Sequence, residues 1–94
     1  MPQLVVHHTV EDYDKWKPVF DGHADFRKES GCTGGTLYRS EDNPNEIIAI
    51  WDWDTLENAR AFTQSDSLRQ AMQSAGVVGR PDLYFVNEVE TLPY

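Results

Sequence analysis

Cysteine is nearly absent from this chain, because Cys32 is the single thiol among its 94 residues. One thiol cannot form an intrachain disulfide, and it cannot supply the set of thiolates that a cysteine-based zinc site needs. No His or Asp neighbours it in sequence, so we expect an inert thiol. Such sparing use of cysteine is typical of a cytoplasmic protein.

Basic residues are also scarce, with 8 Lys and Arg against 16 Asp and Glu and a formal net charge of −8. Nucleic-acid-binding domains carry clustered basic side chains that neutralise phosphates, and acidic proteins avoid anionic membrane surfaces. No apolar run approaches the roughly 18 residues of a membrane-spanning helix, and the N-terminus lacks the regions of a signal peptide. We therefore expect neither a nucleic-acid nor a membrane partner.

Aromatic residues, by contrast, are plentiful: three Trp, four Tyr and four Phe. Disordered acidic segments contain few aromatic side chains, and this length suits one domain. The sequence therefore predicts a single folded domain over residues 1–94 with aromatic residues in its core.

Hydrophobic periodicity and capping residues predict four strands and two helical regions. We expect strands at residues 4–9, 33–40, 46–53 and 82–90, and helical regions at 12–30 and 54–76. Asp12, Asp54 and Ser65 are the expected N-caps, while Pro18 and Gly22 predict a kink in the first region. The order βαββαβ predicts a ferredoxin-like α+β fold, with helices on one face of a four-stranded antiparallel sheet.

The third predicted strand, residues 46–53, is apolar on both faces. Helices cover only one face of such a sheet, so the other face needs a partner. A second copy of the same chain supplies a self-complementary surface. We therefore expect a homodimer through the open sheet face, which gives a dimeric α+β barrel.

Two stretches of the sequence carry a family resemblance. One runs from His8 to Arg27, and the other from Trp53 to Val77. Together they resemble the antibiotic biosynthesis monooxygenases and their relatives among the dimeric α+β barrels, over roughly residues 4–90. That superfamily includes cofactor-free quinol monooxygenases, haem-degrading enzymes, polyketide cyclases, lactone isomerases and proteins without known activity, so the fold alone does not fix the reaction.

The resemblance also bears on cofactors. Haem-degrading relatives place an axial histidine on the second helical region, where this chain has Met72 and no histidine between residues 54 and 94. Haem is therefore not expected, and we expect no cofactor. Trp53 matches the tryptophan that lies beside the substrate in the family, which makes it a candidate wall of the pocket.

His8 and His23 are the main candidates for chemistry, because imidazole exchanges protons near neutral pH. One lies on the first strand and the other on the helix that packs back on it, so both are expected to face one cavity. Arg27, one turn further, is the expected partner of a developing oxyanion. Further candidate substrate-binding residues are Trp16, Phe20, Tyr38, Trp53, Phe62 and Met72.

Three interpretations follow from these residues. The first is a cofactor-independent monooxygenase, or a related proton-transfer enzyme, acting on a small aromatic or polyketide-like molecule. The second is a non-catalytic small-molecule-binding or stress-related homodimer, in which the histidines make ordinary polar contacts and the aromatics form the core. The third is a metal site, in which His7 or His8 joins His23.

Overall fold

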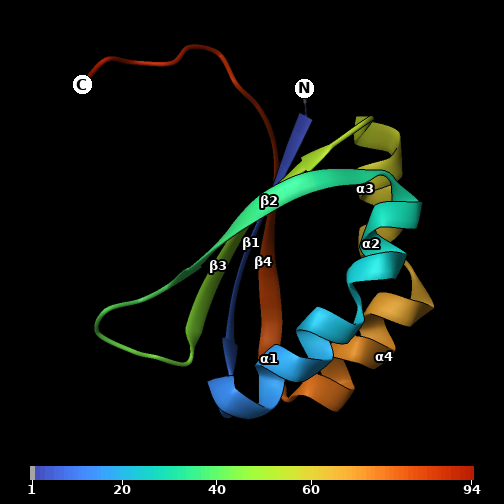
Figure 1. Ribbon diagram of the computed structural model, residues 1–94, viewed down its shortest axis with the longest axis vertical. Coiled ribbons are helices and arrows are strands. Elements are labelled where there is room, and N and C mark those ends of the chain that lie inside the picture. Colours follow the sequence, from blue (N-terminus) through green and yellow to red (C-terminus); the bar gives the residue numbers. More distant parts are fainter. Residues whose placement is uncertain (1) are drawn as a thin grey trace.

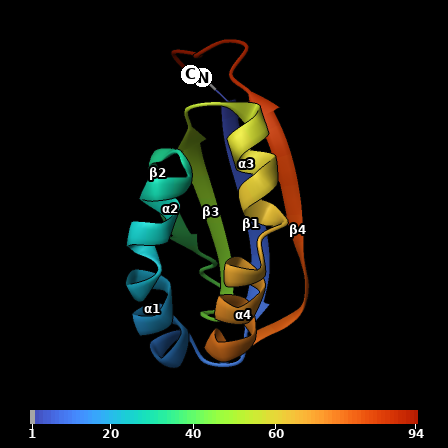
Figure 2. The same cartoon turned by 90° about the vertical axis from the view of Figure 1, so that its right-hand side faces the viewer.

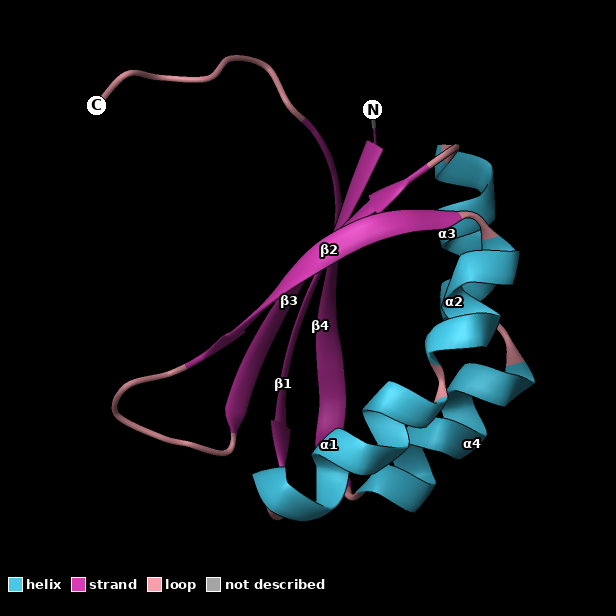
Figure 3. Ribbon diagram, in the orientation of Figure 1, coloured by secondary structure: helices cyan, strands magenta, loops and turns pink. Residues whose placement is uncertain are grey.

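The computed structural model describes residues 2–94, which form four strands and four helices (Figures 1 and 3). In chain order they are β1 (Pro2–Val10), α1 (Tyr13–Gly22), α2 (Ala24–Ser30), β2 (Cys32–Arg39), β3 (Glu46–Trp53), α3 (Leu56–Thr63), α4 (Asp66–Ala75) and β4 (Val77–Asn87). No helix in this part of the chain is long and apolar enough to cross a bilayer.

The strands form one antiparallel sheet in the order β2-β3-β1-β4. All four helices lie against the same face, with α1 and α2 beside α3 and α4 (Figure 2). The predicted ferredoxin-like α+β fold is therefore confirmed. Each helical region consists of two helices, because the chain breaks at His23 in one and around Gln64 in the other.

Side chains alternate along β1, and this alternation separates two environments. Leu4, Val6 and Val10 are buried against the helices, whereas Val5 and His7 lie on the open face. Two core clusters result on the helix side, one around Trp53 and Phe62 and one around Trp16 and Ile47. The aromatic core expected from the composition is present in both clusters.

Several predicted helix boundaries are confirmed by contacts and backbone conformations at the helix termini. The Asp12 carboxylate accepts a hydrogen bond from the backbone of Asp14 at 2.9 Å, and Ser65 Oγ accepts one from Leu68 at 3.2 Å. Gly31 and Gly76 have left-handed conformations at the ends of α2 and α4, where a residue with a side chain would be strained.

Two predictions about the helices need correction. Helix α1 continues through Pro18, so the predicted kink does not occur at the proline and lies directly after Gly22. Thr55, rather than Asp54, caps α3, because its hydroxyl accepts a hydrogen bond from the backbone of Asn58 at 3.0 Å. The Asp54 side chain instead accepts bonds from the Thr55 backbone and the Asn58 amide.

Strand β4 also differs from the prediction. It begins at Val77, directly after α4, and ends at Asn87, which leaves Val89 97% exposed beyond the sheet. Its start was missed because Gly79 and Pro81 disfavour a regular strand. The register confirms the irregularity: His7 pairs with Asp82 and Thr9 with Val78, so residues 79–81 lie opposite His8 alone.

Gly35 on β2 marks a close approach between neighbouring strands, a usual role of glycine within a strand. It pairs with Trp51 of β3, and the Trp51 ring occupies the space that a Cβ atom at position 35 would need. Trp51 therefore lies directly over the backbone of β2.

We predict that Gly35→Ala destabilises the fold by about 1 to 3 kcal/mol, the usual cost of forcing an extra methyl group into filled space. Gly22→Ala is the matched control, because nothing lies within 4 Å of its Cβ position. A helical alanine there is expected to be neutral or to stabilise by up to about 1 kcal/mol. Urea unfolding of both variants measures the difference, and equal midpoints would contradict the close approach.

Candidate functional site

His8 projects from β1 into the layer between the sheet and the helices. Its ring packs edge-on against Trp16 of α1, with ring centroids 5.6 Å apart. Both ring nitrogens are buried and have no hydrogen-bond partner within residues 2–94. Burial, with a smaller contribution from the charge of His7, lowers the pKa of His8 to about 4. The imidazole is therefore neutral at pH 7, with one lone pair and one N–H unused.

Arg27 of α2 lies over two aromatic rings that pack on each other, with centroids 5.6 Å apart. Its guanidinium carbon is 4.2 Å from the Phe20 ring centroid and 4.8 Å from that of Trp51, and Nη1 donates to the Phe20 carbonyl at 2.9 Å. Burial lowers the pKa of Arg27, although a guanidinium stays charged at neutral pH. These contacts fix one positive charge beside an aromatic surface.

His23 occupies the break between α1 and α2. Its ring stacks near Phe26 and Phe62, and Nε2 lies 3.2 Å from the hydroxyl of Ser67 on α4. Burial and the neighbouring Arg27 charge both lower its pKa, so His23 is also neutral near pH 7. The helical break thus brings a second imidazole toward α4.

A cavity of about 70 Å³ lies between the sheet and the helices, and His8, His23 and Arg27 all line it. Four of the candidate substrate-binding residues also line it: Trp16, Phe20, Phe62 and Met72. The rest of the wall is mostly aliphatic, including Leu4, Val6, Ala49, Leu68, Ala71 and Leu83. The structure therefore brings all three candidate catalytic side chains to one apolar space.

Two candidate residues lie elsewhere, and both assignments are corrected. Tyr38 pairs with Ile48 and is 50% exposed on the open face, across the sheet from the cavity. Trp53 is 0% exposed in the core beneath α3, with its ring centroid 5.0 Å from that of Phe62. Its Nε1 has no partner within residues 2–94, but the side chain does not line the cavity.

Trp51 takes the place in the wall that was expected for Trp53. The two side chains share a face of β3, so alternation alone does not separate them. The sequence offered no signal to separate them, because the pairing of Gly35 with Trp51 follows only from the register of β2 against β3. Thr63 at the end of α3 was also missed, and nothing in its sequence context marked it.

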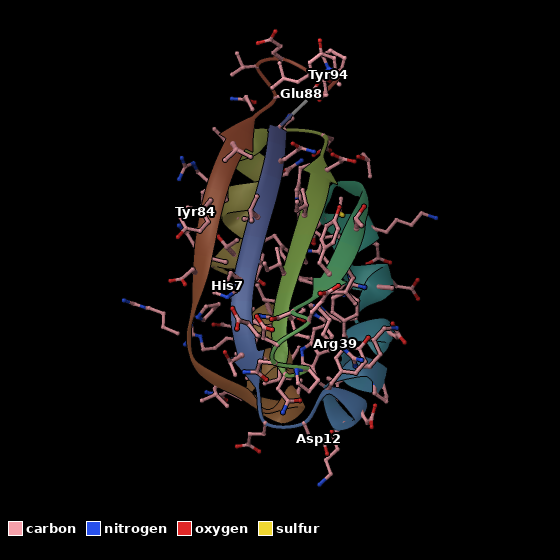
Figure 4. The ribbon with its side chains drawn as sticks, turned by 90° about the vertical axis from the view of Figure 1, so that its left-hand side faces the viewer. His7, Asp12, Arg39, Tyr84, Glu88 and Tyr94 are labelled. Carbon is pink, nitrogen blue, oxygen red and sulfur yellow. The ribbon has the colours of Figure 1, made fainter. Side chains whose placement is uncertain are left out.

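His7 has surroundings opposite to those of His8. On the open face its Nε2 lies 2.8 Å from Glu46 and its Nδ1 3.4 Å from Asp82 (Figure 4). Hydrogen bonding to Glu46 is the main cause that raises its pKa. Among residues 2–94, no group of three or more His, Cys, Asp or Glu side chains is placed to hold a metal ion.

The site can do three things chemically. A neutral imidazole accepts a proton from a bound hydroxyl or acidic C–H group, and the unused N–H of a neutral imidazole donates. A fixed guanidinium stabilises negative charge that develops on the ligand. The aromatic and aliphatic walls favour a planar, apolar molecule and exclude water.

Solved structures show the same fold. The cofactor-independent oxygenase SnoaB of Streptomyces nogalater is 21% identical, with a TM-score of 0.79 over 99% of this chain and 97% of that one. A Bordetella bronchiseptica protein described as an antibiotic biosynthesis monooxygenase is 19% identical, with a TM-score of 0.79 over 95% and 97%. A conserved Methanosarcina mazei protein is 13% identical, with a TM-score of 0.72 over 93% and 91%.

Sequence comparison gives the family itself. No curated protein matches the chain. The model of the antibiotic biosynthesis monooxygenase family, however, matches residues 6–74, which include His8, His23, Arg27 and Met72. Because this match spans most of the chain, the protein belongs to the antibiotic biosynthesis monooxygenase family.

Proposed function

We propose that this protein is a cofactor-independent monooxygenase that oxidises a small aromatic molecule bearing an ionisable hydroxyl group. The observation that carries the proposal is the His8 imidazole, which is buried in an aromatic cavity with both nitrogens unpartnered. Leaving buried polar atoms unpaired costs free energy, so such a group is typical of a site awaiting a ligand. The likeness to SnoaB, a cofactor-independent oxygenase, supports the same class of reaction.

In the proposed reaction His8 accepts the proton of a substrate hydroxyl. The resulting phenolate is electron-rich and its charge is balanced by Arg27, which is already oriented by Phe20 and Trp51. Dioxygen is the oxidant and the substrate supplies all the electrons. For a quinol, one oxygen atom enters a ring carbon to give a hydroxyquinone, and the other leaves as water, so that no external reductant is needed.

His23 has a supporting role in this proposal. It is neutral and lies on the same cavity wall, with Ser67 fixing one ring nitrogen. From there it orients the substrate or returns a proton to the reduced oxygen atom. A cyclase or isomerase would use the same histidines without dioxygen, so consumption of dioxygen separates these reaction classes.

We predict that His8→Ala lowers kcat/KM for quinol oxidation by about 10²- to 10⁴-fold, the usual contribution of a positioned general base. Oxygen uptake over a panel of benzo- and naphthoquinols measures this, and ¹⁸O₂ labelling shows whether one atom enters the product. His7→Gln is the control, because it alters an imidazole on the other face of the sheet. Equal activity of the His8→Ala variant and the parent would contradict the assignment.

The low pKa of His8 predicts an unusual pH profile. The base form persists until the pH falls to about 4, so kcat/KM should be retained from pH 7 to pH 5 and lost only near pH 4. Histidine NMR titration should place the pKa of His8 well below 6.5 and that of His7 above it. An acid limb centred near 6.5 would mean that His8 is not the base.

We also propose that the protein is a homodimer through its open sheet face (Figure 4). Exposed apolar side chains gather there, and several belong to the edge strands: Tyr38 is 50%, Tyr84 56% and Val86 38% exposed. Ile48 and Ile50 of the central strand β3 continue the patch. A second copy would bury this surface, since monomeric proteins rarely expose large apolar patches.

Tyr84→Lys is therefore predicted to shift the protein from dimer to monomer in sedimentation velocity, because it places a charge within the buried patch. Leu56→Lys is the matched control. It makes the same change at a 38% exposed residue on the helix side and should leave the dimer intact. A wild-type protein that sediments as a monomer at micromolar concentration would refute the dimer.

A further inference from the structure

A second hollow lies beside the His8 cavity, on the outer side of Met72. It has a volume of about 400 Å³ and lies between the α3–α4 turn, α4 and β4. Thr63, Leu68, Met72 and Leu83 line both spaces, so these four side chains form a shared wall. We name this second hollow the outer groove. Methionine in such a wall is readily displaced, because its unbranched side chain adopts many rotamers.

The sizes of the two spaces bear on the substrate. The inner cavity, at about 70 Å³, is about half the roughly 150 Å³ of an engineered protein cavity that binds benzene. An aromatic ring therefore needs more room than the inner cavity provides. The outer groove lies within the usual range of about 300 to 1,000 Å³ for ligand sites. A substrate that reaches His8 is thus expected to extend past Met72.

The charges along this path are all positive. Arg27 lines the inner cavity and Arg69 and Arg80 line the outer groove, whereas none of the 16 Asp and Glu residues, all within the described residues 2–94, lines either. The side chains along this path are therefore positively charged, although the net charge of the whole chain is −8. The arrangement favours an anionic ligand and disfavours a cationic one.

The two outer arginines are available to a ligand. Arg80 lies in the irregular segment of β4 opposite His8 and makes no ion pair within residues 2–94. Arg69 pairs with Asp66 at 3.0 Å, but both side chains are mostly exposed, at 68% and 84%. Such surface pairs contribute little and are easily exchanged for another anion. A carboxylate suits the guanidinium fork because it accepts two parallel hydrogen bonds.

We propose that the substrate is an aromatic acid, whose ring enters beside His8 while its carboxylate binds Arg69 and Arg80 in the outer groove. This inference deepens the proposed function and rests on it, because that function places the reacting ring at His8. The two arginines add a second recognition element, which the shared wall of Thr63, Leu68, Met72 and Leu83 separates from His8. Substrate selection then depends on charge outside the apolar cavity as well as on fit within it.

Anaerobic calorimetry with a matched probe pair tests the proposal without turnover. The probes are 3-(2,5-dihydroxyphenyl)propanoate and its uncharged methyl ester. The wild-type protein is expected to bind the acid about tenfold more tightly than the ester. Combining Arg69→Gln with Arg80→Gln should reduce the affinity for the acid to that for the ester, with the ester itself little changed.

Arg60→Gln is the control, because it removes an exposed positive charge from α3 that contacts Phe85 and lines neither space. It should keep the tenfold preference for the acid. The single variant Arg80→Gln should lose part of the preference for the acid. This result would show that the loss in the double variant does not come from a folding defect. Equal affinity for acid and ester in the wild type, failure of the acid to bind, or a preference that survives in the double variant would each overturn the proposal.

Aerobic oxygen uptake with the same probes separates this inference from the proposed function. If the ester is oxidised with no preference for the acid, only the aromatic-acid assignment fails. If the acid binds through the two arginines but neither probe consumes oxygen, the acid site stands and the monooxygenase assignment fails.

Discussion

The contact between Gly35 and Trp51 is the one on which the site depends. Because position 35 has no side chain, the Trp51 ring can lie against the backbone of β2 on the helix side of the sheet. The ring packs against Phe20, and the Arg27 guanidinium lies over both rings. Phe20 in turn packs on Trp16, which contacts His8. A chain of aromatic contacts thus links an edge strand to the buried imidazole.

Adjacent histidines in this chain have opposite properties because the sheet separates them. His7 faces two carboxylates in a half-exposed position, and hydrogen bonding favours its protonated form. His8 faces apolar side chains, and burial favours its neutral form. The pair shows how the twofold alternation of a strand places a structural and a candidate catalytic group side by side in sequence.

Much of this organisation was readable in the sequence. The order of elements, the caps at Asp12 and Ser65, and the meeting of His8 with His23 and Arg27 follow from local patterns and from the packing of a helix on its own sheet. The sequence did not show which of Trp51 and Trp53 lines the cavity. Both lie on one face of β3, and only the position of α3 decides which of them is covered. Tyr38 was misplaced for a related reason, since its face depends on the register of β2 against β3.

The start of β4 could not be predicted from the sequence either, because residues 79–81 interrupt the alternation that identifies a strand. Bulges of this kind bend a strand and redirect its side chains. Here the same irregularity lies opposite His8 and carries Arg80, so an insertion or deletion in this segment would alter the surroundings of His8 and the charge of the outer groove in one step. These three residues lie in an edge strand. In a family that reuses one fold for different substrates, a single change in the length of this segment would therefore shift reactivity and selectivity together.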